Sequence, residues 1–201
     1  MSDDDICYMS ATEALSRFRD RSLSPVELTE AVIQRSEAIA DTVNPMGDCY
    51  FDEAMTRAKA AEVKYARPGG RPRRLEGLPL AVKDSSAVRG QRSTNGSMID
   101  KDNIDTTTDP AIARLLRAGA NLFARTTMPE FGWLFTTHSR MWGVTRNPWR
   151  LDVTPGGSSG GQAASRRRCC IPWPCAPDQR RRAPSRRRCP GREPEPNTSE
   201  H

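Results

Sequence analysis

The sequence has 201 residues, with 31 Lys and Arg against 25 Asp and Glu and a formal net charge of +6. The basic excess lies entirely in residues 166–201, which contain ten arginines and four acidic residues and leave a balanced 21 basic and 21 acidic in residues 1–165. A neutral body argues against a nucleic-acid-binding domain, which would carry a basic surface. The length suffices for one domain. No apolar run of about 18 residues occurs, so we expect no membrane span.

The N-terminus is acidic and has no apolar core segment, which argues against a signal peptide and favours a cytoplasmic protein. Six cysteines are present, and free thiols are the expectation for that compartment. The two histidines, His138 and His201, form no helical metal pair, and the cysteines lack the paired spacing of a zinc site. We therefore expect no metal.

Three helices are expected in the first third of the chain. Ser10 with Glu13, and Ser24 with Glu27, have the capping-box spacing that starts a helix. A third helix is expected over residues 52–66. The apolar positions expected to face the core of these helices are Leu15, Phe18, Leu28, Ala31, Val32, Ile39, Ala54, Ala58, Ala61 and Val63.

The hydrophobic pattern then changes from helical spacing to short apolar runs. Residues 78–82 and 121–124 are typical of buried strands. Asp109 and Pro110 begin a helix between them, and Gly119 ends it. This helix should turn Ile112, Leu115 and Leu116 inward. A strand, a helix and a strand in this order predict a parallel crossover, and hence an α/β core.

Two features suggest acyl-transfer chemistry. Lys83 ends the first apolar run, and ligand sites lie at the carboxyl ends of parallel strands. A desolvated lysine can act as a base, although a lysine at a strand end is also commonly a solvated charge. Residues 155–161 place Ser158 and Ser159 among four glycines, which let backbone amides approach a substrate closely. Such a run can also be a flexible linker, but residues 162–164 can start a helix whose exposed amides would stabilise negative charge.

A second interpretation of the same run is a serine esterase. Residues 157–161 satisfy the G-x-S-x-G pattern, with Ser159 as the nucleophile. That mechanism requires a downstream histidine, and His201 is the one histidine that follows.

Five segments in order resemble the amidase-signature family, and the resemblance covers roughly residues 8–165. The segments are residues 77–84 (Gly-Leu-Pro-Leu-Ala-Val-Lys-Asp), 94–97 (Thr-Asn-Gly-Ser), 127–131 (Thr-Met-Pro-Glu-Phe), 143–149 (Gly-Val-Thr-Arg-Asn-Pro-Trp) and 155–161 (Pro-Gly-Gly-Ser-Ser-Gly-Gly). The resemblance implies an α/β fold with a mixed sheet flanked by helices. It also implies hydrolysis of carboxamide carbon–nitrogen bonds by a Ser–cis-Ser–Lys triad, a small-molecule amide substrate and no cofactor.

By this resemblance Lys83 is the triad lysine, and Ser158 is the bridging serine on a cis peptide bond. Ser159 and four glycines would support the loop; these glycines are Gly156, Gly157, Gly160 and Gly161. Phe131 and Trp133 are expected either to line the acyl pocket or to pack in the core.

The family's nucleophilic serine lies in a further segment of the Gly-Thr-Asp-x-Gly-Gly-Ser kind, and the sequence has no such segment. Residues 166–201 are instead rich in Arg and Pro, which predicts a disordered tail after a domain of residues 1–165. We expect this tail to be an out-of-frame translation that leaves an incomplete, inactive fragment. The alternative is a genuine basic tail that binds nucleic acid through phosphate contacts.

Overall fold

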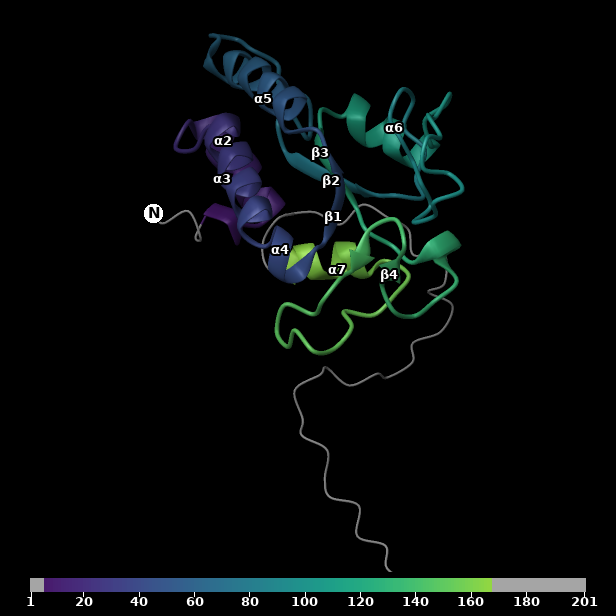
Figure 1. Ribbon diagram of the computed structural model, residues 1–201. Helices are drawn as coiled ribbons and strands as arrows, with labels where there is room; N and C mark the ends of the chain where they lie inside the picture. The colour runs from purple at the N-terminus through teal and green to yellow at the C-terminus, as the bar shows by residue number, and fades with distance from the viewer. Residues whose placement is uncertain (1–5, 168–201) are drawn as a thin grey trace, which may run out of the picture.

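The computed structural model describes residues 6–167, and its centre is a three-stranded mixed sheet (Figure 1). The strand order is β1-β3-β2, with β1 at Met46–Cys49, β2 at Pro79–Lys83 and β3 at Asn121–Thr126. Strands β2 and β3 are parallel, as the sequence predicts, and β1 pairs with β3 in the antiparallel direction. Within residues 6–167, no helix is long and apolar enough to cross a membrane.

Helices α2 (Ala11–Asp20), α3 (Pro25–Ala38) and α5 (Phe51–Ala66) precede the parallel strands, with the short α4 (Ala40–Val43) between α3 and β1. The capping box that begins α3 is complete: Ser24 N donates to Glu27 Oε2, and the Ser24 hydroxyl accepts from the first turn. At α2 the predicted box is half formed, because Ser10 Oγ accepts from Glu13 N while the Glu13 carboxylate pairs with Arg17. Two of the three expected helices therefore begin at caps that the sequence encodes.

The two faces of the sheet are covered by different helices. Helices α2, α3 and α5 enclose one cluster of buried apolar residues, to which the sheet contributes Ala81, Phe123 and Ala124. On the other face, Leu80, Val82 and Leu122 pack with Ile112 of α6 (Pro110–Arg117). Every residue of β2 and β3 is buried, and the sheet lies as a central layer between α2, α3 and α5 on one side and α6 on the other (Figure 1).

Two sequence expectations are corrected, and one strand was not anticipated. Val63 is 50% exposed, because the buried stripe of α5 consists of Ala54, Ala58 and Ala61. Strand β1 was not anticipated, since Met46–Cys49 has no apolar run. The last helix, α7 (Gly160–Arg167), begins two residues before Gln162, so two glycines of the Gly/Ser run belong to it. The predicted tail lies almost entirely outside the described residues.

The segment between β2 and α6 is a long loop over residues 84–109, fastened to the sheet by a buried ion pair. Arg125 of β3 is fully buried, and its Nη2 lies 3.2 Å from Asp105 Oδ2. The Asp105 carboxylate also accepts from Val88 N and from Ser93 Oγ. Asp105 thus links the loop near Val88 and Ser93 to β3.

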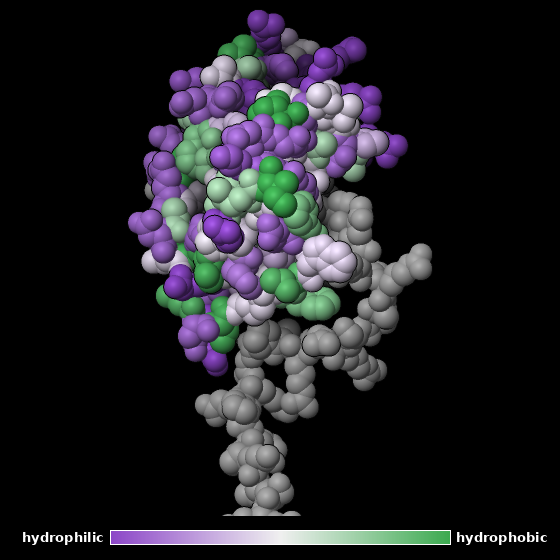
Figure 2. All heavy atoms as spheres, turned by 45° about the vertical axis from the view of Figure 1, so that its right-hand side comes forward, coloured by the Kyte–Doolittle hydropathy of each residue, from purple (hydrophilic) through white to green (hydrophobic). Residues whose placement is uncertain are grey.

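After β3 the chain forms the 3₁₀ turn η1 (Glu130–Gly132) and the small hairpin of β4 (His138–Ser139) and β5 (Gly143–Val144) before it reaches α7. Large apolar side chains are exposed along this stretch, among them Trp133, Phe135 and Trp149. On the face shown in Figure 2, apolar side chains lie interspersed among polar ones.

Candidate active site

The amino group of Lys83 lies between two serine hydroxyls. Lys83 is the last residue of β2 and is 8% exposed. Its Nζ is 2.8 Å from Ser158 Oγ and 2.9 Å from Ser159 Oγ. The two features that the sequence singled out separately, a strand-end lysine and a Gly/Ser run, are therefore one cluster at the carboxyl end of β2. The lysine is not the solvated charge that was the alternative.

The glycines of the run let it pack where a side chain could not fit. A Cβ on Gly160 would lie 2.0 Å from Thr137 Oγ1, and one on Gly161 would lie 2.3 Å from Thr127 Oγ1. A Cβ on Gly157 would lie 2.7 Å from the carbonyl oxygen of Leu134. Gly156 has a φ of +95°, which L-residues rarely adopt. The run is therefore a packed loop and not a flexible linker.

The peptide bond between Gly157 and Ser158 is cis, as the resemblance implies. The adjacent helix α7 begins at Gly160, directly after the serine pair. The positive end of its dipole therefore lies beside Ser158 and Ser159, where it favours negative charge.

The η1 turn borders the same serine. Gly132 has a φ of +69°, and a Cβ built on it would lie 3.6 Å from both Cβ and Oγ of Ser158. Phe131 and Trp133 flank this glycine and are 45% and 74% exposed. Core packing of these two aromatic residues, one of the two expectations, is therefore wrong.

Asp84 is a residue of this region that the sequence analysis did not single out. It follows Lys83 and is fully buried. Its carboxylate accepts from Thr94 N at 2.9 Å, Gly96 N at 3.0 Å, Trp142 Nε1 at 2.9 Å and the Thr94 hydroxyl. The one signal in the sequence was an acidic residue directly after the strand-end lysine, close to a buried strand where burial of a charge is costly unless donors satisfy it.

Trp142 is itself held by a charged pair. The guanidinium of Arg92 lies 5.4 Å from the centroid of the Trp142 ring, within the range of a cation–π contact. Arg92 Nε donates to Asp48 Oδ2 at 2.8 Å, and this carboxylate raises the pKa of Arg92. Strand β1, which carries Asp48, is thereby connected through Arg92 to Trp142, one of the donors to Asp84.

Comparison with known proteins identifies the lineage. The profile of the Amidase family matches residues 27–165. The chain belongs to the Amidase family. It is 35% identical over 166 residues to an acylamidase of Rhodococcus erythropolis, covering 82% of this chain and 34% of that protein. It is 33% identical over 161 residues to a component of the glutamyl-tRNA(Gln) amidotransferase of Carboxydothermus hydrogenoformans, covering 80% of this chain and 33% of that protein.

Solved structures agree with this assignment. A bacterial aryl acylamidase of the amidase signature family superposes with a TM-score of 0.77 at 30% identity, covering 82% of this chain and 34% of that one. A fatty acid amide hydrolase has the same fold, with a TM-score of 0.80 at 24% identity over 85% of this chain and 30% of the other. The chain thus spans about a third of the length of the Amidase-family relatives that it matches.

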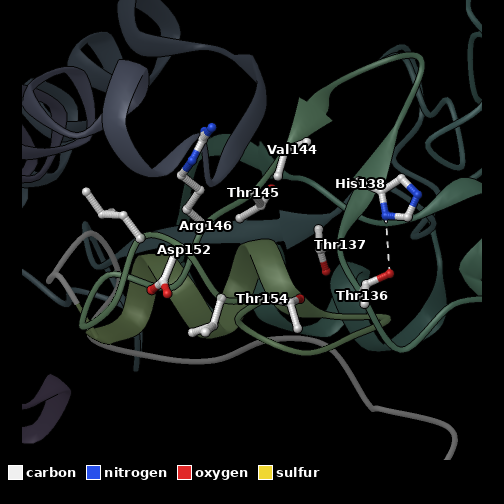
Figure 3. A pocket seen from close by; sticks show the side chains of 10 residues that line it. Thr136, Thr137, His138, Val144, Thr145, Arg146, Asp152 and Thr154 are labelled. Carbon is white, nitrogen blue, oxygen red and sulfur yellow. Dashed lines mark hydrogen bonds between the residues drawn. The ribbon is translucent and has the colours of Figure 1, made fainter.

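A cavity of about 410 Å³ lies beside the Gly/Ser run of this Amidase-family chain (Figure 3). Its lining includes Thr136, His138, Asp152 and Thr137, whose hydroxyl donates to Gly156 O at 2.7 Å. His138 is exposed and its Nδ1 is 3.2 Å from Thr136 Oγ1 (Figure 3). Lys83 and Ser158 are not among the lining residues.

The other functional expectations fare as follows. His201, the histidine that the esterase interpretation requires, lies outside the described residues. Within residues 6–167, no three His, Cys, Asp or Glu side chains form a group that could hold a metal ion.

Proposed function

We propose that this chain carries the lysine and the bridging serine of a site that hydrolyses carboxamide bonds, and that the 201-residue chain by itself forms no acyl-enzyme. The observation that carries the proposal is the 2.8 Å contact between Lys83 Nζ and Ser158 Oγ at the carboxyl end of β2. Membership of the Amidase family and the acylamidase relative support the substrate class, a small-molecule carboxamide.

The proposed roles follow from the position of Ser158 next to the Lys83 amine. In its neutral form, the Lys83 amine accepts the Ser158 hydroxyl proton while Ser158 accepts a proton from an attacking hydroxyl. In the return step Ser158 gives a proton to the leaving amine while Lys83 gives its proton back to Ser158, so no net proton is lost over the acylation step. Low exposure of Lys83 supports the role, because desolvation disfavours the charged ammonium. Ser159, 2.9 Å from the same nitrogen, would hold the amine in place.

The attacking hydroxyl is the part that the chain does not supply in this proposal. In the family it belongs to a serine of a Gly-Thr-Asp-x-Gly-Gly-Ser segment, which the sequence does not contain. In the family the backbone amides of the same segment also form the oxyanion hole, so its absence removes a whole catalytic unit and not one rate factor. We further propose that residues from about 166 onward are translated out of frame. Translation of the gene in all three frames just past codon 165 tests this, and an intact frame encoding the same tail in related genes would contradict it.

A chimera tests the assignment of roles. Residues 1–165 are joined to the part of the Rhodococcus acylamidase that follows its aligned segment, and hydrolysis of an anilide is measured. The chimera should hydrolyse the anilide, and Lys83→Ala or Ser158→Ala should lower kcat by at least about a thousandfold. Lys59→Ala, at an exposed position of α5, is the matched control and should have no effect.

Two outcomes would contradict the proposal. Full activity of the Lys83→Ala chimera would remove the lysine from the mechanism. Turnover of a carboxamide by the unmodified 201-residue chain, lost on Lys83→Ala, would show that the chain is active by itself.

A serine esterase remains a second candidate because Ser159 Oγ also contacts Lys83 Nζ. A fluorophosphonate probe followed by peptide mapping separates the two. Modification of Ser159 in the unmodified chain would favour the esterase, whereas the proposed role predicts no modification of either serine.

A further inference from the structure

The buried carboxylate of Asp84 accepts hydrogen bonds from four groups on three residues. The four groups that donate to it are two backbone amides, a threonine hydroxyl and an indole N–H. We propose that Asp84 is a positioning residue for the Lys83–Ser158 pair, acting through the turn of residues 94–97 and then through η1. The inference rests on the proposed function only in assigning a catalytic role to the Lys83–Ser158 pair. The positioning of that pair by Asp84 can be tested without measuring hydrolysis.

The first step joins the strand end to the turn. A buried carboxylate is tolerated when donors satisfy its oxygens, and charge-assisted hydrogen bonds are stronger than neutral ones. Three of the four donors, the amide and hydroxyl of Thr94 and the amide of Gly96, belong to the turn itself. Asp84 N donates to Thr126 O at 3.1 Å, so the same residue is also fastened to β3. The turn is therefore fixed relative to the end of β2, one residue from Lys83.

The second step joins the turn to η1. Asn95 O accepts from Phe131 N at 2.8 Å, and Ser97 Oγ donates to Glu130 Oε1 at 2.6 Å. Gly96 has a φ of +68°, and a Cβ on it would lie 2.6 Å from Met128 O. The turn thus makes a close, two-bond contact with the start of η1.

The third step reaches the serine. Gly132 ends η1, and a Cβ built on it would lie 3.6 Å from both Cβ and Oγ of Ser158, so the two residues are neighbours. The contacts form a closed circuit, because Ser158 Oγ in turn contacts Lys83 Nζ. A displacement of the turn would therefore move η1, which lies beside the Ser158 side chain.

Two variants interrupt the circuit, and the same loop offers a matched pair of controls. Asp84→Asn places a side-chain NH₂ group opposite the amide, hydroxyl and indole donors that now bond to the carboxylate. Ser97→Ala removes the hydroxyl that bonds to Glu130 without a change of charge. Asp105→Asn and Ser93→Ala alter the neighbouring network, in which a buried carboxylate likewise accepts from a serine. This second network supports β3 through Arg125. Ser97→Thr keeps the hydroxyl and serves as the conservative rescue.

Two measurements on the full chain decide the inference. Asp84→Asn and Ser97→Ala should accelerate amide exchange of Phe131 and Gly132 by about tenfold relative to the amides of α3. They should also raise the rate at which acetic anhydride acylates Lys83, relative to the exposed Lys59, because the serine hydroxyls no longer hold its amine. Ser97→Thr and both controls should leave these two ratios unchanged.

An equal effect of all four loop variants, or no effect of Asp84→Asn and Ser97→Ala, would overturn the inference. Neither readout requires turnover, so a failure here is distinct from a failure of the proposed function. If the anilide chimera is inactive while exchange and acylation follow Asp84 and Ser97, the positioning circuit holds and the assigned chemistry fails.

Discussion

Lys83 and Ser158 are 75 residues apart in the chain, and their Nζ and Oγ atoms lie 2.8 Å apart. The contact forms because β2 ends where the Gly/Ser run passes over the sheet, and α7 packs against both β2 and β3. Glycines at Gly160 and Gly161 allow that approach, since either Cβ would collide with a threonine. The proximity of the two groups is thus a property of backbone packing as much as of the side chains themselves.

Gly161→Ala should therefore disrupt the packing that places the serine pair beside Lys83. Its Cβ would lie 2.3 Å from Thr127 Oγ1 and 2.5 Å from the backbone nitrogen of Thr127, neither of which can move freely. We expect a loss of about 2–4 kcal/mol in the free energy of unfolding, measured by urea denaturation. Gly156→Ala meets no atom within 4 Å and should cost only about 1 kcal/mol, from its positive φ. Equal losses would argue against the close packing of α7.

Glu76 should make stability depend on acid pH. Its side chain is 3% exposed, and hydrogen bonds from Arg73, with a further one from Lys64, lower its pKa from 4.5 to about 2. The stabilisation is thus fully present above about pH 4.5 and is lost as the pH falls through about 2. Because Lys64 and Arg73 are 44% and 49% exposed, screening limits it to about 1–2 kcal/mol.

The test compares urea midpoints of the wild type and of Glu76→Gln at pH 7 and pH 3. The difference in urea midpoint between the wild type and the variant should be smaller at pH 3 than at pH 7, since only the wild type carries a titrating carboxylate at position 76. Parallel losses in the two proteins would show that Glu76 does not contribute.

Arg125→Met should be strongly destabilising. It leaves Asp105, whose side chain is 8% exposed, without its cation, and breaking a buried pair typically costs about 3–5 kcal/mol. The double variant Arg125→Met/Asp105→Asn should lose less than the sum of the two single losses, because the uncompensated charge is gone. Thermal unfolding of the four proteins measures this coupling, and strict additivity would contradict it.

Ser24→Ala should cost more than Ser10→Ala. Ser24 makes a complete capping box at α3, and its hydroxyl also bonds to the carboxylate of Glu62 on α5. Ser10 accepts one bond at α2. Loss of a cap costs about 1 kcal/mol, so Ser10→Ala should approach that value and Ser24→Ala should exceed it. The comparison uses proteolytic susceptibility of the two helices, and the reverse order would be inconsistent with the contacts.

Local patterns predicted what depends on neighbours a few residues away. The start of α3 at Ser24, the strand ending at Lys83 and the parallel pairing of β2 with β3 all follow from capping, apolar runs and connection length. The candidate residues Lys83 and Ser158 were also identifiable, because their segments have the motifs of a known family. Val63 shows the limit of such patterns, since helical spacing alone does not say how wide the buried stripe is.

The amino-acid sequence by itself determined the starts of α2, α3 and α6, the two buried strands and the choice of Lys83 and the serine pair as candidates. Only the tertiary structure decided that Lys83 reaches both serines, that β1 joins the sheet and that Asp84 connects the strand end to the turn at Thr94. The physical reason is distance along the chain: caps and apolar periods arise from contacts within a few residues. The circuit through Asp84, by contrast, joins segments up to 75 residues apart, whose meeting no local pattern records.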